Sequence, residues 1–166
     1  MTSFTTCSRG HSIKAVPIER ECYVGLVLDR KSERIMVVGA PQGGMEIEEI
    51  AKSHPDAIIR EVVEPAIGMA AFQARQIAFR LGLAPAQVNR CVTTLLGAYR
   101  AFRDLDATMV EINPLVVTKD GAVLALDAKM TFDDNALYRH TELETLRDLD
   151  EEDPAEIEAG KYALNY

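Results

Sequence analysis

The sequence predicts an α+β fold in which a mainly antiparallel sheet is packed by helices. Apolar runs rich in Val, Ile and Leu lie on both sides of a central block with helical periodicity. Strands that precede and follow a block of helices, rather than alternating with them, are typical of α+β layering and not of a doubly wound parallel sheet. With 166 residues, 48% hydrophobic and 27% charged, the chain is long enough to bury a substantial core.

The first strands are predicted by short apolar runs with polar turns between them. Residues 21–29 and 34–40 flank the polar segment 30–33 and predict a β-hairpin. Residues 57–63 predict a third strand. Residues 1–17 show no period of 2 or 3.6, and we expect them to form an irregular N-terminal segment.

Helical patterns occupy the middle of the chain. Acidic residues open the segment 45–53, where they suit the positive end of a short helix. The preceding pair Gly43-Gly44 indicates either a strand-to-helix turn or a loop that presents amides to phosphate, and the turn is the preferred interpretation. Residues 69–81 and 85–102 repeat apolar side chains at helical spacing and predict two helices that pack on the core.

Residues 108–118 and 122–130 predict a second hairpin whose register decides what its polar side chains can do. If residues 119–121 form a three-residue loop with a left-handed glycine, two polar pairs face each other across the hairpin: Asn113 with Asp127, and Glu111 with Lys129. A two-residue loop would instead turn Asp127 to the opposite face, and a bulge at Pro114 would change the count.

One face of this hairpin therefore combines hard oxygen donors with a cation. Mg²⁺ prefers oxygen ligands and usually takes only one or two from the protein, so Asp127 and the amide oxygen of Asn113 suit it, while Lys129 is placed to attract phosphate. The structural alternative is a cross-strand salt bridge between Glu111 and Lys129, with Asn113 capping the bend before Pro114. Spacing alone favours this alternative.

Charge and cysteine content exclude several classes of function. A formal net charge of −8 argues against nucleic acid or an anionic membrane as a partner, and we expect neither. The sequence shows no membrane span or signal peptide, so we expect a cytoplasmic location, or the mitochondrial matrix in a eukaryote. The three cysteines (Cys7, Cys22 and Cys91) lack metal-site spacing and predict reduced thiols.

Several short motifs follow one another along the chain. They are GGMEIE (43–48), FQAR (72–75), AFRLGL (78–83), EINPLVVTKDG (111–121), LDAK (126–129) and DNALYR (134–139). Together they resemble the β subunit of succinyl-CoA synthetase (succinate–CoA ligase) and of its relative malate–CoA ligase over about residues 18–166. The resemblance implies an ATP-grasp fold, of which residues 18–140 are the second lobe, and it reverses the preference for the salt bridge.

The resemblance also implies a role for each candidate site residue. Asn113 and Asp127 fall on the family's Mg²⁺ ligands, and Glu111 on an acid that approaches a phosphohistidine supplied by an α subunit. Glu21 falls on a contact to the nucleotide, which is ATP/ADP or GTP/GDP, and Lys129 is expected to assist catalysis. None of the histidines matches the phosphohistidine, and all are expected at the surface: His11, His54 and His140.

The implied enzyme is an acid–CoA ligase of the tricarboxylic acid cycle that forms ADP or GDP. It would act as a heteromer with the α subunit, and it would contact CoA and a dicarboxylic acid through regions that this chain lacks. Residues 141–166 are expected to be an acidic helical tail leading to a missing CoA-ligase domain. Because no segment resembles the first lobe, we expect the isolated chain to be inactive, and the alternative is a non-catalytic, truncated interaction module.

Overall fold

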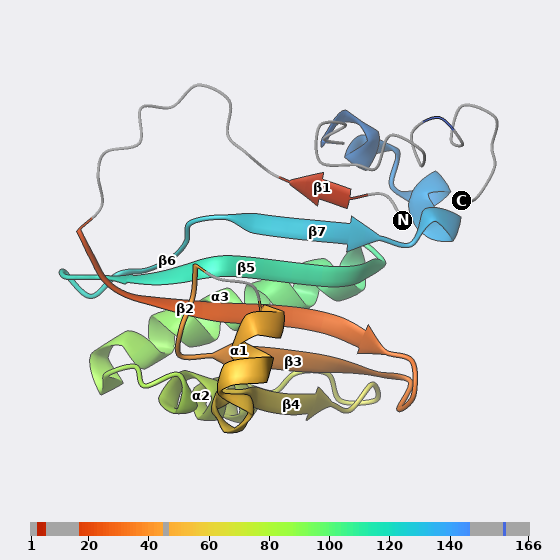
Figure 1. Ribbon diagram of the computed structural model, residues 1–166. Coiled ribbons are helices and arrows are strands. Elements are labelled where there is room, and N and C mark those ends of the chain that lie inside the picture. Colours follow the sequence, from red (N-terminus) through yellow and green to blue (C-terminus); the bar gives the residue numbers. More distant parts are fainter. Residues whose placement is uncertain (1–2, 6–16, 45–46, 147–157, 159–166) are drawn as a thin grey trace.

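A single antiparallel sheet forms the centre of the molecule (Figure 1). The computed structural model describes residues 3–5, 17–44, 47–146 and 158. Within these residues the sheet has seven strands in the order β1-β7-β5-β2-β3-β4, with β6 also paired to β5, and every pair is antiparallel. The strands are β1 (Ser3–Thr5), β2 (Ile18–Asp29), β3 (Arg34–Ala40), β4 (Ile59–Val63), β5 (Ala107–Thr118), β6 (Val123–Ala125) and β7 (Ala128–Phe132). The predicted α+β class is confirmed.

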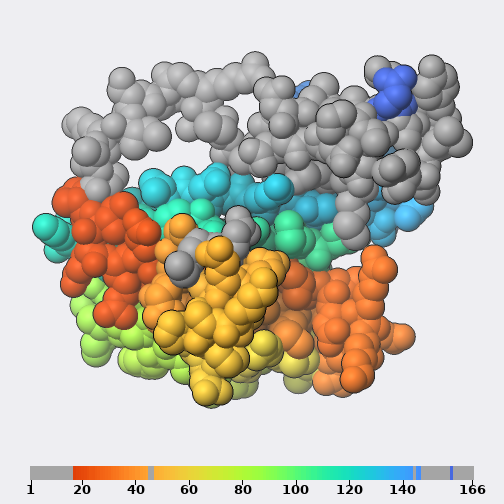
Figure 2. Space-filling view, in the orientation of Figure 1, coloured from red at the N-terminus to blue at the C-terminus, as the bar shows by residue number. Residues whose placement is uncertain are grey.

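Helices cover the two faces of this sheet unequally. The longer helices α2 (Ala71–Arg80) and α3 (Pro85–Asp104) lie on one face, and the short helix α1 (Ile47–Ser53) lies on the other, toward the viewer in Figure 1. Figure 2 shows the α1 segment, in yellow, standing out from this second face. Short 3₁₀ helices complete the described chain: η1 (Pro55–Ala57), η2 (Asp134–Arg139) and η3 (Thr141–Leu146). No helix among the described residues is both long and apolar enough to cross a membrane.

Alternation along the strands builds a separate apolar cluster on each face. On β2, Cys22, Val24 and Leu26 are fully buried in the main core beneath α2 and α3, whereas the intervening Tyr23 belongs to a small cluster beneath α1. Because successive strand residues point to opposite faces, β2 contributes to both clusters at once. The small cluster consists of Tyr23, Ala40, Ile50 and Ile58. It covers the β2–β3 side of the α1 face.

Gly82 follows the C-terminal end of helix α2, and Gln73 holds its first turn. Gly82 has a positive φ of 79°, which is the left-handed conformation typical of a residue that ends a helix. At the other end, the amide oxygen of Gln73 accepts a hydrogen bond from the Ala70 N–H at 3.1 Å, and its NH₂ group donates to a Glu61 oxygen at 2.9 Å. Gln73 therefore joins α2 to β4.

The second hairpin has the predicted register but a broken second strand. Glu111 pairs with Lys129, Val117 pairs with Val123, and Gly121 has the left-handed φ of 80° that a three-residue loop requires. The predicted strand 122–130 is divided into β6 and β7 at Leu126 and Asp127. Pro114 explains the break: Leu126 N–H donates to the Pro114 carbonyl at 3.1 Å, but proline has no N–H to return the bond.

A bulge on β5 lies at the same place but faces the other neighbouring strand. Cys22 pairs with Leu115 and Val24 pairs with Ile112, so Asn113 and Pro114 together face a single residue of β2. The Asn113–Pro114 peptide bond is cis. The bulge moves the inward-facing positions of β5 by one residue, so that Val110 and Ile112 reach the main core before it, and Leu115 and Val117 after it.

Two expectations about the ends of the chain are modified. The first 17 residues, expected to be irregular, contain the strand β1, which pairs with β7. Three residues are too few to show a period, so only a pairing with a strand far along the chain could define it. Of the expected helical tail at 141–166, residues Thr141–Leu146 form the 3₁₀ helix η3 and Glu158 is helical, while residues 147–157 and 159–166 lie outside the described residues.

Candidate functional site

The polar side chains of the second hairpin share the face of the sheet that carries α1. On β5, Glu111 is flanked by Val110 and Ile112, which are buried beneath α2 and α3, so Glu111 points to the opposite face. Its cross-strand neighbours are Gly25 on β2 and Lys129 on β7. The predicted pairing of Glu111 with Lys129 is confirmed as a register; an ion pair between their side chains stays a prediction.

Asn113 and Asp127 face each other where the hairpin is broken. The Asn113 N–H donates to the Asp127 carbonyl at 3.3 Å, which fixes the two residues opposite one another. Asn113 is half-buried and Asp127 is exposed. The bulge that could have spoiled this juxtaposition affects only the pairing with β2, so the three-residue-loop prediction holds at the site.

The Gly43-Gly44 turn brings a third segment to Asn113. The Gly44 N–H donates to the side-chain oxygen of Asn113 at 2.8 Å, across 69 positions of sequence. Gly44 has φ +74°, and a Cβ added to it would lie 2.8 Å from a carboxylate oxygen of Glu21. The turn therefore lies close to both the Glu21 carboxylate and the Asn113 side chain.

Close packing explains why both positions in this turn are glycine. A Cβ on Gly43 would lie 2.6 Å from the carbonyl oxygen of Cys22, closer than real Cβ atoms approach any backbone atom. The preferred interpretation of the pair as a tight strand-to-helix turn is thereby supported. Sequence reasoning did not predict the contact of Gly44 with Asn113, although two glycines directly before a helix were a signal that some backbone approaches closely there.

Tyr23 belongs to the small cluster under α1 and also lies next to this site. A Cβ on Gly25 would lie 2.9 Å from the Tyr23 hydroxyl oxygen, so the phenol ring extends along the sheet over Gly25. Gly25 is the β2 partner of Glu111, and the hydroxyl group therefore lies over the sheet row that carries Glu111. The ring itself is 6% exposed. The aromatic ring of Tyr23 therefore lies beside the row of the sheet that carries Glu111, with its hydroxyl group as the one polar end.

The donor set suits a magnesium ion that takes few ligands from the protein. Asp127 offers an exposed carboxylate, and Asn113 offers an amide oxygen that already accepts the Gly44 hydrogen bond, and both are hard oxygen donors of the kind that Mg²⁺ prefers. A closed, protein-only metal cage is a different arrangement: the described residues contain no group of three or more His, Cys, Asp or Glu side chains that could hold a metal. The pair fits Mg²⁺ whose other ligands come from water or phosphate.

The described histidines lie outside this site, and one of them is not a surface residue. His54 is exposed, as predicted. His140 is only 13% exposed, and its Nε2 lies 2.8 Å from the Asp106 carboxylate, which also pairs with Arg139 at 2.9 Å. The expectation of a surface position was wrong for His140, because a carboxylate far away in sequence gives the ring a polar partner inside the fold. His11 lies outside the described residues.

The sequence profile of the ATP-grasp domain matches residues 4–117. This match covers more than half of the chain, and the chain therefore belongs to the ATP-grasp domain family. Its antiparallel sheet with helices on both faces agrees with that assignment.

Within this family the chain is most informatively compared with β subunits of CoA ligases. It is 52% identical over 90% of its length to a protein from Acidobacterium capsulatum named succinate–CoA ligase [ADP-forming] subunit beta. It is 48% identical over its whole length to a protein of the same name from Geobacillus thermodenitrificans. It is also 52% identical over 96% of its length to a Mesorhizobium japonicum protein named probable malate–CoA ligase subunit beta. The chain spans 38%, 45% and 40% of these relatives, respectively.

Solved structures share the fold at low sequence identity. An ATP citrate lyase from Methanothrix soehngenii, solved with citrate and coenzyme A, superposes with a TM-score of 0.59 at 18% identity, covering 78% of this chain and 28% of that one. An acetyl-coenzyme A synthetase from Ca. Korarchaeum cryptofilum gives a TM-score of 0.51 at 17% identity, covering 70% and 51%. At these identities the likeness describes the architecture alone.

Proposed function

We propose that this chain is the magnesium-nucleotide-holding lobe of an ADP- or GDP-forming succinate–CoA ligase β subunit. The observation that carries the proposal is the juxtaposition of Asn113 and Asp127 across the broken hairpin, with the Asn113 oxygen held by the Gly44 amide. Identity of about 50% to β subunits of that name supports the choice of ligase.

In this proposal Asn113 and Asp127 hold Mg²⁺. When bound, the ion would offset the negative charge of the nucleotide phosphates. The Gly44 hydrogen bond orients the Asn113 amide before any ligand arrives, which lowers the entropic cost of binding. Glu21, on the other side of the same turn, is placed to contact the nucleotide, which is ATP/ADP or GTP/GDP.

Glu111 and Lys129 are assigned to the phosphoryl-transfer step. They are paired across β5 and β7 on the face that carries the metal ligands. Lys129 would draw a phosphate group toward the sheet by charge, while Glu111 would accept a hydrogen bond from a phosphohistidine ring presented by an α subunit. Binding of CoA and the dicarboxylic acid is assigned to that subunit and to the parts of the ligase beyond this lobe.

Two other functions have a specific observation in their favour. Malate–CoA ligase is supported by 52% identity to the Mesorhizobium japonicum protein. A non-catalytic interaction module is the second alternative, and the chain spans less than half of each ligase β subunit that it matches. Mixing the chain with a first-lobe protein and an α subunit distinguishes them: succinate-dependent release of ADP or GDP, malate-dependent release, or no release.

The metal site can be tested without turnover by using Mn²⁺ as a paramagnetic substitute for Mg²⁺. In ¹⁵N-labelled chain, we expect Mn²⁺ to broaden the amide signals of Gly44, Asn113 and Asp127 first. Asp127→Asn keeps the shape of the side chain but removes its charge, and it should weaken Mn²⁺ binding by about tenfold or more, because a carboxylate is the stronger ligand. Calorimetry with Mg-ADP, after adding a first lobe, then tests the nucleotide.

Asp56→Asn is the matched control, since it removes an equally exposed carboxylate from η1. It should leave the Mn²⁺ affinity within about twofold. Broadening spread evenly over the acidic surface, or equal losses in the two variants, would show that Asn113 and Asp127 are not the ligands.

A further inference from the structure

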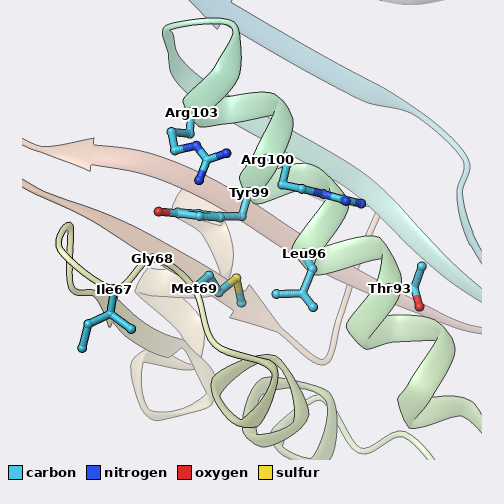
Figure 3. A pocket seen from close by; sticks show the side chains of 8 residues that line it. All are labelled: Ile67, Gly68, Met69, Thr93, Leu96, Tyr99, Arg100 and Arg103. Carbon is cyan, nitrogen blue, oxygen red and sulfur yellow. The ribbon is translucent and has the colours of Figure 1, made fainter.

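A second concave site lies on the opposite face of the sheet, between α3 and the loop that leads into α2. It has a volume of about 380 Å³ and is open to solvent. Eight residues line it: Ile67, Gly68, Met69, Thr93, Leu96, Tyr99, Arg100 and Arg103. Figure 3 shows the loop residues 67–69 facing the side chains of α3 across the opening. None of these residues belongs to the Asn113–Asp127 site.

The floor of this pocket is apolar and well packed. Met69 is 9% exposed and Tyr99 is 5% exposed, and Leu96 packs against the main core. Gly68, at φ +76°, turns the loop so tightly that a Cβ there would lie 3.3 Å from the Tyr99 hydroxyl oxygen. The floor is therefore set by the fold rather than by exposed side chains, which is how pockets for small molecules are usually formed.

Two arginines of α3 border the pocket, and Figure 3 shows their guanidinium groups pointing in different directions. Arg103 pairs with its sequence neighbour Asp104 at 2.7 Å, and both side chains are more than half exposed. Arg100 is exposed and has no acidic partner among the residues that the structure describes. An exposed pair such as Arg103–Asp104 stabilises little, so both arginines can turn to an incoming anion.

The segment that lines the pocket is cationic, although the chain as a whole is acidic and Glu64 and Asp104 flank this segment. Residues 65–103 contain no Asp, Glu or Lys, in a chain of formal net charge −8. Their only charged side chains are exposed arginines: Arg75, Arg80, Arg90, Arg100 and Arg103. A second copy of this face would be repelled by it, because a two-fold contact would bring arginines against arginines. The favoured occupant is an anion.

The pocket-lining residues of α3 follow one another along the helix axis. Thr93, Leu96, Arg100 and Arg103 are spaced by three or four positions, so they form one stripe along the helix, about 15 Å long. Figure 3 shows Arg103 at one end of this stripe and Thr93 at the other, with Leu96 between them. The charged end and the apolar stretch are therefore in line.

We propose that this pocket binds an organic anion with a carboxylate or phosphate head group and a short apolar tail. The head group lies between Arg100 and Arg103, where bidentate hydrogen bonds from guanidinium groups are available. The tail lies over Leu96, Met69 and Tyr99 and gains affinity by leaving water. This ligand is distinct from the nucleotide of the proposed function, and the two assignments stand or fall separately.

Hexanoate is a suitable probe, because it combines one carboxylate with five apolar carbons. Titrating it into the ¹⁵N-labelled full chain should give saturable shifts in the amides of Gly68, Met69, Leu96 and Tyr99. Hexanamide, which keeps the tail but lacks the charge, and acetate, which keeps the charge but lacks most of the tail, should each bind at least about fivefold more weakly. Hexyl phosphate then compares the phosphate head group with the carboxylate.

Arg100→Gln and Arg103→Gln should each weaken hexanoate binding by about fivefold or more. The matched control is Arg80→Gln, which removes an exposed arginine of α2 outside the pocket and should change the affinity less than about twofold. All three changes are at the surface, and the dispersion of the amide spectrum verifies folding. Unsaturable or scattered shifts, or an equal loss in Arg80→Gln, would overturn the proposal.

Discussion

At the scale of single residues, Asn113 shows how a ligand is prepared by its surroundings. An asparagine side chain without a hydrogen bond would sample several rotamers, whereas the Asn113 oxygen is held by the Gly44 N–H at 2.8 Å. Asp127, opposite it, is exposed and supplies charge. Asn113 therefore provides an oriented oxygen atom, and Asp127 provides the negative charge that attracts a cation.

The buried cysteines are a second residue-scale feature with a measurable consequence. Cys22 and Cys91 are both fully buried and free, Cys22 on β2 and Cys91 on α3. Burial raises the pKa of Cys22 from 9.0 to about 11, with a smaller opposing effect of Arg20, and burial together with Cys22 raises the pKa of Cys91 to about 12. The folded state thus holds both thiols in their protonated form.

These raised pKa values predict a loss of stability in alkali. Unfolded thiols ionise near pH 9.0, while the folded ones stay protonated until about pH 11, so stability is fully present below pH 9.0 and declines above it. In urea titrations at about pH 8 and pH 10.5, the free energy of unfolding should fall by roughly 4 kcal/mol more in the parent chain than in Cys22→Ala/Cys91→Ala, about 2 kcal/mol for each thiol. Equal falls in the two proteins would contradict the assignment.

At the scale of elements, the short turn between β3 and α1 controls the site. The backbone of Gly43 packs against Cys22, and Gly44 lies close to Glu21 and donates a hydrogen bond to Asn113. The two glycines that follow β3 therefore contact both β2 and β5. The bulge on β5 also helps to position Asn113, because it places Asn113 and Pro114 against one residue of β2 and leaves the hairpin register intact. Bulges beside sites commonly re-aim a side chain in this way.

Alanine substitutions at two glycines should therefore have opposite effects. Gly43→Ala forces a Cβ against the Cys22 carbonyl and should destabilise the fold by about 2 kcal/mol or more. Gly97→Ala lies inside α3, where a Cβ meets nothing within 4 Å, and should stabilise it by about 0.5–1 kcal/mol. Urea unfolding of both variants measures this. A neutral Gly43→Ala would show that the turn can move away from β2.

At the scale of the whole molecule, the sheet separates two surfaces of different chemistry. The α1 face carries the carboxylates and the lysine of the proposed metal site, and the face covered by α2 and α3 carries the arginines and the second pocket. A direct link between them exists: Arg90 of α3 donates to the Gly121 carbonyl at 2.6 Å, at the loop of the site hairpin. The two surfaces are otherwise divided by the main core.

This separation predicts that the two sites bind independently. The dissociation constant of hexanoate should change by less than about twofold when about 10 mM Mg²⁺ is added, since the core between the sites is densely packed and neither site needs the other to rearrange. Two hexanoate titrations, with and without Mg²⁺, are sufficient. A change of about fivefold or more would indicate coupling, and Arg90→Gln would show whether it passes through the Gly121 contact.

The sequence alone determined the parts of this protein that depend on local periods and turn chemistry. Apolar alternation located both hairpins, helical spacing located α2 and α3, and a three-residue loop at Lys119-Asp120-Gly121, one of two loop lengths considered, predicted Asn113 opposite Asp127. These features were predictable because a strand period of two and a left-handed glycine act within a few residues.

Only the tertiary structure decided which distant segments meet. The Gly44 bond to Asn113 spans 69 positions, β1 pairs with β7, and the second pocket joins the loop 67–69 to α3. The surface position predicted for His140 was wrong for the same reason, because Asp106, directly before β5, contacts its ring. Such contacts depend on how whole faces pack, and a one-dimensional pattern shows that a face exists without showing what covers it.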